Sequence, residues 1–109
     1  MAGASSLPAA EALALAALIV PTPGGIASRV LAKTPGGNVT LFAFDAGQGL
    51  TEHTTSFDAL VLVLEGRMQL TIGGAPVEAV PGTVVLMPGT VPHALEAKEA
   101  SRMLLVMVR

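Results

Sequence analysis

Short apolar segments separated by glycine and proline turns make up most of this chain, and this pattern constrains the fold more than any other feature. From residue 26 onward the apolar runs are four to seven residues long, and pairs such as Gly73-Gly74 and Pro81-Gly82 stand between them. Runs of this length bounded by turn residues predict strands. The expected strands are residues 26–32, 39–45, 50–53, 60–65, 68–72, 77–80, 83–87, 93–97 and 102–108. Many short strands joined by tight turns predict an all-β sandwich or barrel of antiparallel sheet.

Residues 8–18, PAAEALALAAL, differ from the rest because they are rich in strong helix formers. Pro8 suits the first helical position, and Ser5 and Ser6 are available as a cap, so the sequence predicts a short N-terminal helix that ends before Pro21. The sequence has no linker, internal repeat or low-complexity tract that would divide it. We therefore expect one domain over residues 1–109, with the helix and its linker in residues 1–25 and the β-barrel in residues 26–109.

The composition excludes several classes of function. Cysteine is absent, so disulfides, thiolate metal sites and cysteine nucleophiles are excluded, and a metal or acid–base site must use His, Asp or Glu. The net charge is −2 and only six Lys and Arg residues are present, which provides no basic surface for nucleic acid. Residues 12–20 are about half as long as a membrane span and have no basic flank. We expect a soluble, cytoplasmic protein without nucleic-acid or membrane partners.

The apolar content predicts a partner subunit. Apolar residues make up 51% of the chain and charged residues 13%, which is about half the usual charged share. A small monomer has too little interior for this surplus. The run at residues 59–64 has no polar alternation, so we expect one face to meet the barrel interior and the other to meet a second sheet or a partner. A homodimer is therefore the expected state.

Two stretches combine glycine, proline and histidine at characteristic spacings. In the first, five residues separate Gly47 from His53, and six separate Ala59 from Gly66; in the second, GTVVLMPGTVPH, five residues separate the first glycine from the proline, and His93 closes the stretch. These spacings resemble the two signature motifs of the cupin superfamily, over about residues 39–108. The resemblance is closest to small single-domain bacterial cupins. It implies a jelly-roll barrel of the double-stranded β-helix type, with both motifs lining the barrel mouth.

The resemblance also implies a metal site, with substitutions. In cupins three histidines and a glutamate hold the ion; His53 matches the first histidine and His93 the last, while Thr55 stands at the second histidine and Ala59 at the glutamate. The expected metal ligands are thus His53 and His93, and the expected ion is a divalent transition metal (Zn, Ni, Mn, Fe, Co or Cu). With half of the usual ligands missing, a bound ion should be weakly held. The alternative is a barrel without metal.

Two carboxylates lie close to these positions in the sequence. Asp58 precedes Ala59, and strand alternation turns it to the opposite face; Glu52 has the same relation to His53. Both therefore rank below the histidines as ligands. A metal-free site would use a neutral histidine as general base or acid, and Asp58 is the nearest candidate to orient it.

The expected pocket at the barrel mouth has a few polar groups and apolar walls, which suits a small, mostly apolar molecule. Its expected lining is Thr55, Phe57, Asp58, Val61, Val63, Leu86 and Leu95. Three functions stay open: a metal-dependent cupin enzyme of dioxygenase, isomerase or decarboxylase type, a metal-free ligand-binding or sensory module, and a barrel whose metal site has decayed. The simplest alternative for each histidine is a polar residue at a strand end, satisfied by backbone or water.

Overall fold

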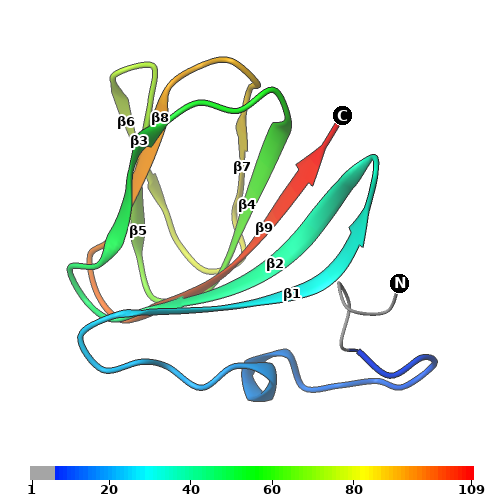
Figure 1. The fold of residues 1–109 in the computed structure, drawn as a ribbon. Coiled ribbons are helices and arrows are strands. Elements are labelled where there is room, and N and C mark those ends of the chain that lie inside the picture. The colour runs from blue at the N-terminus through cyan, green and yellow to red at the C-terminus, as the bar shows by residue number, and fades with distance from the viewer. Residues whose placement is uncertain (1–6) are drawn as a thin grey trace.

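A computed structural model describes residues 7–109 and is built almost entirely from β-strands (Figure 1). The strands are β1 (Ile26–Thr34), β2 (Gly37–Phe44), β3 (Gly49–His53), β4 (Asp58–Glu65), β5 (Met68–Ile72), β6 (Ala75–Ala79), β7 (Val84–Met87), β8 (His93–Ala97) and β9 (Ser101–Val108). Each of them matches one expected strand to within about two residues at either end. The all-β prediction is confirmed.

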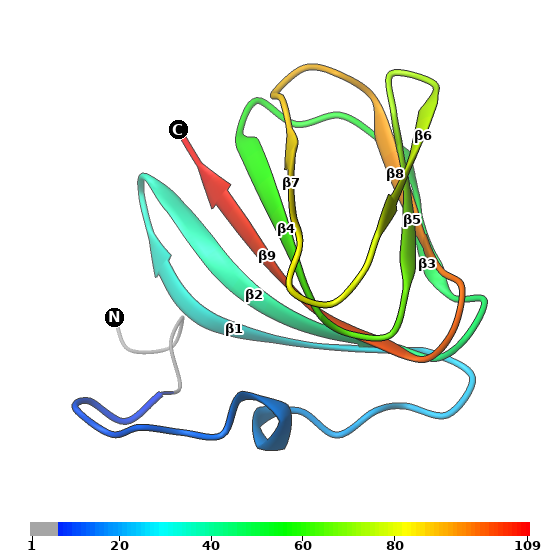
Figure 2. The ribbon, with the colours of Figure 1, turned by 180° about the vertical axis from the view of Figure 1, so that it is seen from behind.

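The strands form two antiparallel sheets that face each other across the interior, as Figures 1 and 2 show from opposite sides. The larger sheet has the order β1-β2-β9-β4-β7, and the smaller has the order β3-β8-β5-β6. From β2 onward the chain passes repeatedly between the sheets, so most strands pair with sequence-distant neighbours, as in a jelly-roll barrel. Strands β3 and β8 pair in the smaller sheet, which brings the two histidine-containing stretches together.

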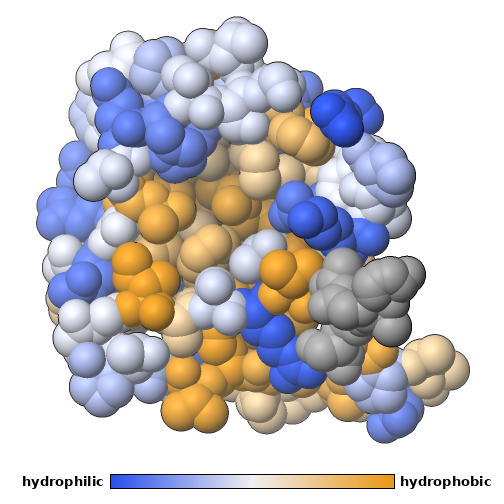
Figure 3. Space-filling view, in the orientation of Figure 1, coloured by the Kyte–Doolittle hydropathy of each residue, from blue (hydrophilic) through white to orange (hydrophobic). Residues whose placement is uncertain are grey.

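Strand alternation places the core between the sheets. Along β4 the buried residues are Ala59, Val61 and Val63, while the residues between them are only partly buried. Met68, Met87 and Met103 are at most 1% exposed, so these methionines serve as core filler, as expected. The same cluster contains Phe44, Leu70, Ala79, Leu95 and Ala97. Figure 3 shows apolar residues gathered in the middle of one face, while its upper part is mainly polar.

The prediction of a short N-terminal helix over residues 8–18 is wrong. The segment contains only a 3-10 turn at Leu15–Leu18, which has no side-chain cap, and the proposed caps Ser5 and Ser6 lie outside the described residues. An isolated helix of this length is marginal in water, so packing decides its conformation. Here Leu15, Leu18 and Ile19 pack on the outer face of the larger sheet in a second apolar cluster. This contact overrides the local helix propensity.

The N-terminal segment covers only part of that outer face. Its cluster includes Leu41 of β2, Leu104 of β9 and Leu64 of β4. Further along the same sheet, Val84 and Leu86 of the edge strand β7 are 58% and 54% exposed.

Within residues 7–109 no helix has the length and apolarity needed to cross a membrane.

Candidate functional site

The two histidines are direct cross-strand neighbours at one end of the smaller sheet. His53 is the last residue of β3, His93 is the first of β8, and the two are register partners. Their ring centroids lie 4.5 Å apart with an interplanar angle of 69°, which is an edge-to-face contact. The structure therefore brings together the two residues that the motif spacing singled out.

The two imidazoles differ in burial but are held in the same way. His93 is 3% exposed, whereas His53 is exposed. The Nδ1 atom of His53 lies 2.7 Å from the carbonyl oxygen of Thr51, and that of His93 lies 3.1 Å from the carbonyl oxygen of Val91. A carbonyl oxygen only accepts hydrogen bonds, so in the neutral rings the proton is on Nδ1. Each Nε2 then carries a lone pair that can accept a proton or bind a metal.

Thr55, at the second histidine position, stabilises the loops of the mouth. Its hydroxyl accepts a hydrogen bond from the backbone N–H of Phe57 at 3.3 Å, and its carbonyl accepts one from the N–H of Thr90 at 2.7 Å. Thr90 has a φ of 68°, which is the left-handed region that favours glycine. The β3–β4 loop and the β7–β8 loop are thus joined directly through Thr55.

Asp58 makes a second connection between the same loops. Its Oδ1 atom accepts a hydrogen bond from the backbone N–H of Gly89 at 2.8 Å, and its side chain is on the exposed side of β4. Ala59 is 2% exposed and faces the core, so the glutamate position of the motif points inward but carries only a methyl group. Glu52 is exposed on β3. The structure does not bring either carboxylate into a cluster with the histidines.

The apolar residues expected to line a pocket divide into three groups. Val61, Val63 and Leu95 are at most 4% exposed and belong to the packed core. Leu86 is 54% exposed and lies on the outer side of β7, because its neighbours on the strand are the ones turned inward, so the structure does not place it at the mouth. Phe57 is partly buried in the β3–β4 loop.

Arg109 belongs to the same rim, and sequence reasoning missed it. Its guanidinium lies 4.7 Å from the centroid of the Phe57 ring, a cation–π contact, and its Nε donates to the carbonyl of Pro35 at 3.1 Å. The terminal position of this arginine gave no signal, because the contact depends on β9 running alongside β4. The rim thus carries the positive charge of Arg109 together with the carboxylate of Asp58.

Comparison with known protein families and solved structures identifies the family of this chain. The family model described as Cupin domain matches residues 40–109. The chain is a cupin. Among solved structures, it is similar to a conserved protein of unknown function from Streptococcus pyogenes, with 32% identity and a TM-score of 0.92 over 100% of this chain and 96% of that one.

Two further solved structures are similar to this cupin. A cupin superfamily protein from Desulfitobacterium hafniense is 29% identical, with a TM-score of 0.87 over 94% of each chain. KdgF from Halomonas sp. is 26% identical, with a TM-score of 0.72 over 79% of this chain and 81% of that one. No protein of curated function matches the chain.

The side chains of this cupin fit a metal only in part. Among the described residues no group of three or more His, Cys, Asp or Glu side chains could hold an ion. His53 and His93 offer two nitrogen ligands with suitable tautomers, which is half of a four-ligand site. Three cavities of about 240–290 Å³ are present on the described surface, and none of these three is lined by either histidine. The histidine pair thus lies outside these three cavities, with His53 exposed and His93 buried.

Proposed function

We propose that the barrel mouth of this cupin binds a small organic ligand that donates hydrogen bonds to the Nε2 atoms of His53 and His93. The observation that carries the proposal is that both Nδ1 atoms lie within hydrogen-bond distance of backbone carbonyls while the rings touch, 4.5 Å between centroids. Each of the two touching rings then offers one acceptor nitrogen. A ligand with one or two N–H or O–H donors on an apolar body matches them.

The surroundings of the pair support such a ligand. Phe57 offers a partly buried aromatic face beside the mouth, and Arg109 lies over the ring of Phe57. An apolar ligand body would rest against rim residues of this kind. Because the loops are joined by Thr55 and Asp58, the mouth is ordered before the ligand arrives.

A second candidate is a divalent transition ion held by the same two nitrogens. Two imidazoles suit Zn, Ni, Mn, Fe, Co or Cu, and coordination positions would remain for water or for the organic ligand. Such an ion would supply Lewis-acid or redox chemistry when bound. His53 and His93 would hold it, while the carbonyls of Thr51 and Val91 would orient the rings.

Catalysis without metal is a third candidate, and it would use Nε2 as general base. A neutral imidazole is suited to proton transfer near neutral pH. Asp58 is not the orienting group in this arrangement, because the Nδ1 atoms of both imidazoles face backbone carbonyls. The backbone carbonyls take that part instead. Turnover of a bound ligand would separate an enzyme from a binding module.

The first experiment tests the two nitrogens directly. Long-range ¹H–¹⁵N spectra of the imidazoles should show the Nδ1–H tautomer for both rings, and an organic ligand should move both Nε2 resonances. A screen of small metabolites by thermal shift supplies the ligand. Binding should be lost in the His53→Ala/His93→Ala double variant and kept in Glu52→Gln, a matched change on the exposed strand beside His53. Hits that the double variant retains would contradict the proposal.

The second experiment separates the metal candidate. Elemental analysis of protein purified without a metal-affinity step, followed by calorimetric titration with Zn²⁺ and Ni²⁺, should reveal bound ion or a weak site that the double variant lacks. Protein that is free of metal and cannot be loaded would remove this candidate and leave organic-ligand binding in place. Binding of an organic ligand only after metal loading would favour the metal candidate.

A further inference from the structure

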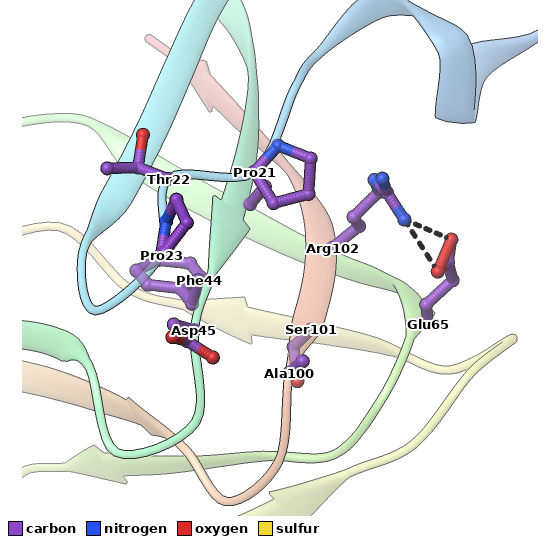
Figure 4. Close-up of a pocket in the computed structure, with 10 residues that line it drawn as sticks. Pro21, Thr22, Pro23, Phe44, Asp45, Glu65, Ala100, Ser101 and Arg102 are labelled. Carbon is purple, nitrogen blue, oxygen red and sulfur yellow. Dashed lines mark hydrogen bonds and ion pairs between the residues drawn. The ribbon is translucent and has the colours of Figure 1, made fainter.

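A cavity of about 290 Å³ lies outside the barrel, at the end opposite the histidines. One wall is the chain segment at Pro21 and Pro23, and the other is the outer side of the larger sheet where β2, β9 and β4 meet (Figure 4). Asp58 begins β4 at the barrel mouth and Glu65 ends it beside this cavity. We propose that the cavity binds a small neutral molecule that carries a carbonyl group.

Two of the polar side chains around the cavity already make hydrogen bonds within the protein. Asp45 accepts hydrogen bonds from the backbone N–H groups of Gly24 at 2.6 Å and Ala46 at 2.8 Å. The hydroxyl of Ser101 accepts from the N–H of Arg67 at 3.0 Å and donates to a backbone carbonyl at 2.7 Å. These groups hold the walls together, and they leave Thr22, Arg102 and its partner Glu65 as the polar groups to consider.

Arg102 has one donor that the described part of the chain does not satisfy. Its Nη1 atom lies 2.7 Å from both carboxylate oxygens of Glu65, as the dashed lines in Figure 4 show. Its Nε atom is buried and has no hydrogen-bond partner among the described residues. A buried N–H without an acceptor is unfavourable, so an acceptor placed there is bound at little cost. Because Arg102 lines the cavity, a ligand oxygen that reaches Nε would be such an acceptor.

The charges around the cavity favour a neutral ligand. Asp45 and Glu65 are negative and Arg102 is positive, so the lining carries one net negative charge. The backbone N–H groups of Gly24 and Ala46 hold the pKa of Asp45 below its usual value, so this carboxylate stays ionised at neutral pH. A carboxylate ligand would meet two like charges. A carbonyl oxygen accepts from Nε–H without adding a charge.

The size and the remaining wall define the ligand further. A volume of about 290 Å³ is at the lower end for small-molecule pockets, so the ligand is small. Pro21 and Pro23 supply most of the apolar surface of the cavity, while Phe44 is 2% exposed and contributes little. Cyclic amides, simple amides and small ketones combine an apolar body with one carbonyl. These compounds form the chemical class that the cavity fits.

The test follows the Nε–H resonance of Arg102 in ¹⁵N-labelled full-length protein. The probe is δ-valerolactam, and cyclopentanecarboxylate is the anionic comparison of similar size. The lactam should shift the Arg102 Nε–H signal and the backbone amides of Thr22 and Asp45 in a saturable way, and the carboxylate should shift them less. If neither probe shifts them, the cavity holds water only and the proposal fails. Tighter binding of the carboxylate would also overturn it.

Two variants separate the Nε–H contact from general packing. Arg102→Lys keeps a positive charge near Glu65 but has no Nε–H, so the dissociation constant for the lactam should rise about fivefold, the ratio typical of one hydrogen bond. Ala100→Leu fills the cavity from an exposed position on its rim and should abolish the shifts. Arg67→Lys is the matched control, because that side chain is exposed, pairs with Glu78 and Glu99, and is not among the residues that line the cavity. Equal binding by Arg102→Lys and the parent would contradict the proposal. Ala100→Leu decides the question if Arg102→Lys fails to fold.

Discussion

Thr90 has a left-handed backbone conformation, and we predict that replacing it with glycine stabilises the protein. Thr90 has a φ of 68°, a conformation that costs a non-glycine residue about 1–2 kcal/mol. Its side chain is exposed and makes no hydrogen bond with the described residues, whereas its backbone N–H, which any residue provides, donates to Thr55 at 2.7 Å. Glycine removes the strain but adds about 0.5–1 kcal/mol of unfolded-state entropy. Thr90→Gly should therefore raise the free energy of unfolding by about 0.5–1 kcal/mol.

Urea denaturation followed by circular dichroism measures this difference. Thr54→Gly is the matched control, because Thr54 is an exposed loop residue in the same part of the mouth and does not have a positive φ. It should lose about 0.5–1 kcal/mol for the entropic reason alone. If both variants are destabilised equally, the strain assigned to Thr90 is absent and the argument is refuted. An unchanged denaturant slope would show that the substitution does not alter the surface exposed on unfolding, so the two free energies can be compared directly.

Three further predictions concern the loops, the acid response and the subunit state. Asp58→Asn should lower the free energy of unfolding by about 1 kcal/mol in urea, because a charge-assisted bond to a backbone N–H is weakened, whereas Glu52→Gln should change it little. Backbone hydrogen bonds lower the pKa of Asp45 from its usual value of 3.8. The contribution of this carboxylate to stability is therefore complete above pH 3.8 and is lost as the pH falls through the folded pKa. Acid unfolding curves of Asp45→Asn should lack this loss, and curves identical to those of the parent would contradict the assignment. We propose a homodimer whose interface covers Val84 and Leu86, which are 58% and 54% exposed. The double variant Val84→Lys/Leu86→Lys should then have half the mass of the parent protein in sedimentation equilibrium. A monomeric parent protein would disprove this interface.

The strands could be predicted from the sequence because their signals are local. Residues 68–72 and 93–97 were expected as strands and form β5 and β8 with the same bounds. The N-terminal segment could not be predicted in the same way. Its alanines and leucines favour a helix, but Leu15, Leu18 and Ile19 find an apolar sheet face formed by residues far along the chain. That surface exists only after folding, so local propensity gave the wrong answer.

The candidate site was only partly predictable, because it depends on register. Motif spacing suggested that His53 and His93 converge, and their pairing across β3 and β8 brings them together. For Leu86, the expected pocket position failed because strand parity turns it outward. The contact between Arg109 and Phe57 requires β9 to end beside the start of β4. The sequence around Arg109 and the sequence around Phe57 give no local indication of this contact.

The mouth of this cupin is held by backbone hydrogen bonds, and these explain how the fold accommodates a reduced set of ligands. The imidazoles lie against the carbonyls of Thr51 and Val91, and the two loops are joined through Thr55 and Asp58. Each contact has a main-chain group as one partner, and the bond from the N–H of Thr90 to the carbonyl of Thr55 is main chain on both sides. The orientation of the histidines is therefore set by strand pairing and loop hydrogen bonds. Because both rings are held through Nδ1, the proposed organic ligand and the proposed ion would compete for the same two Nε2 atoms.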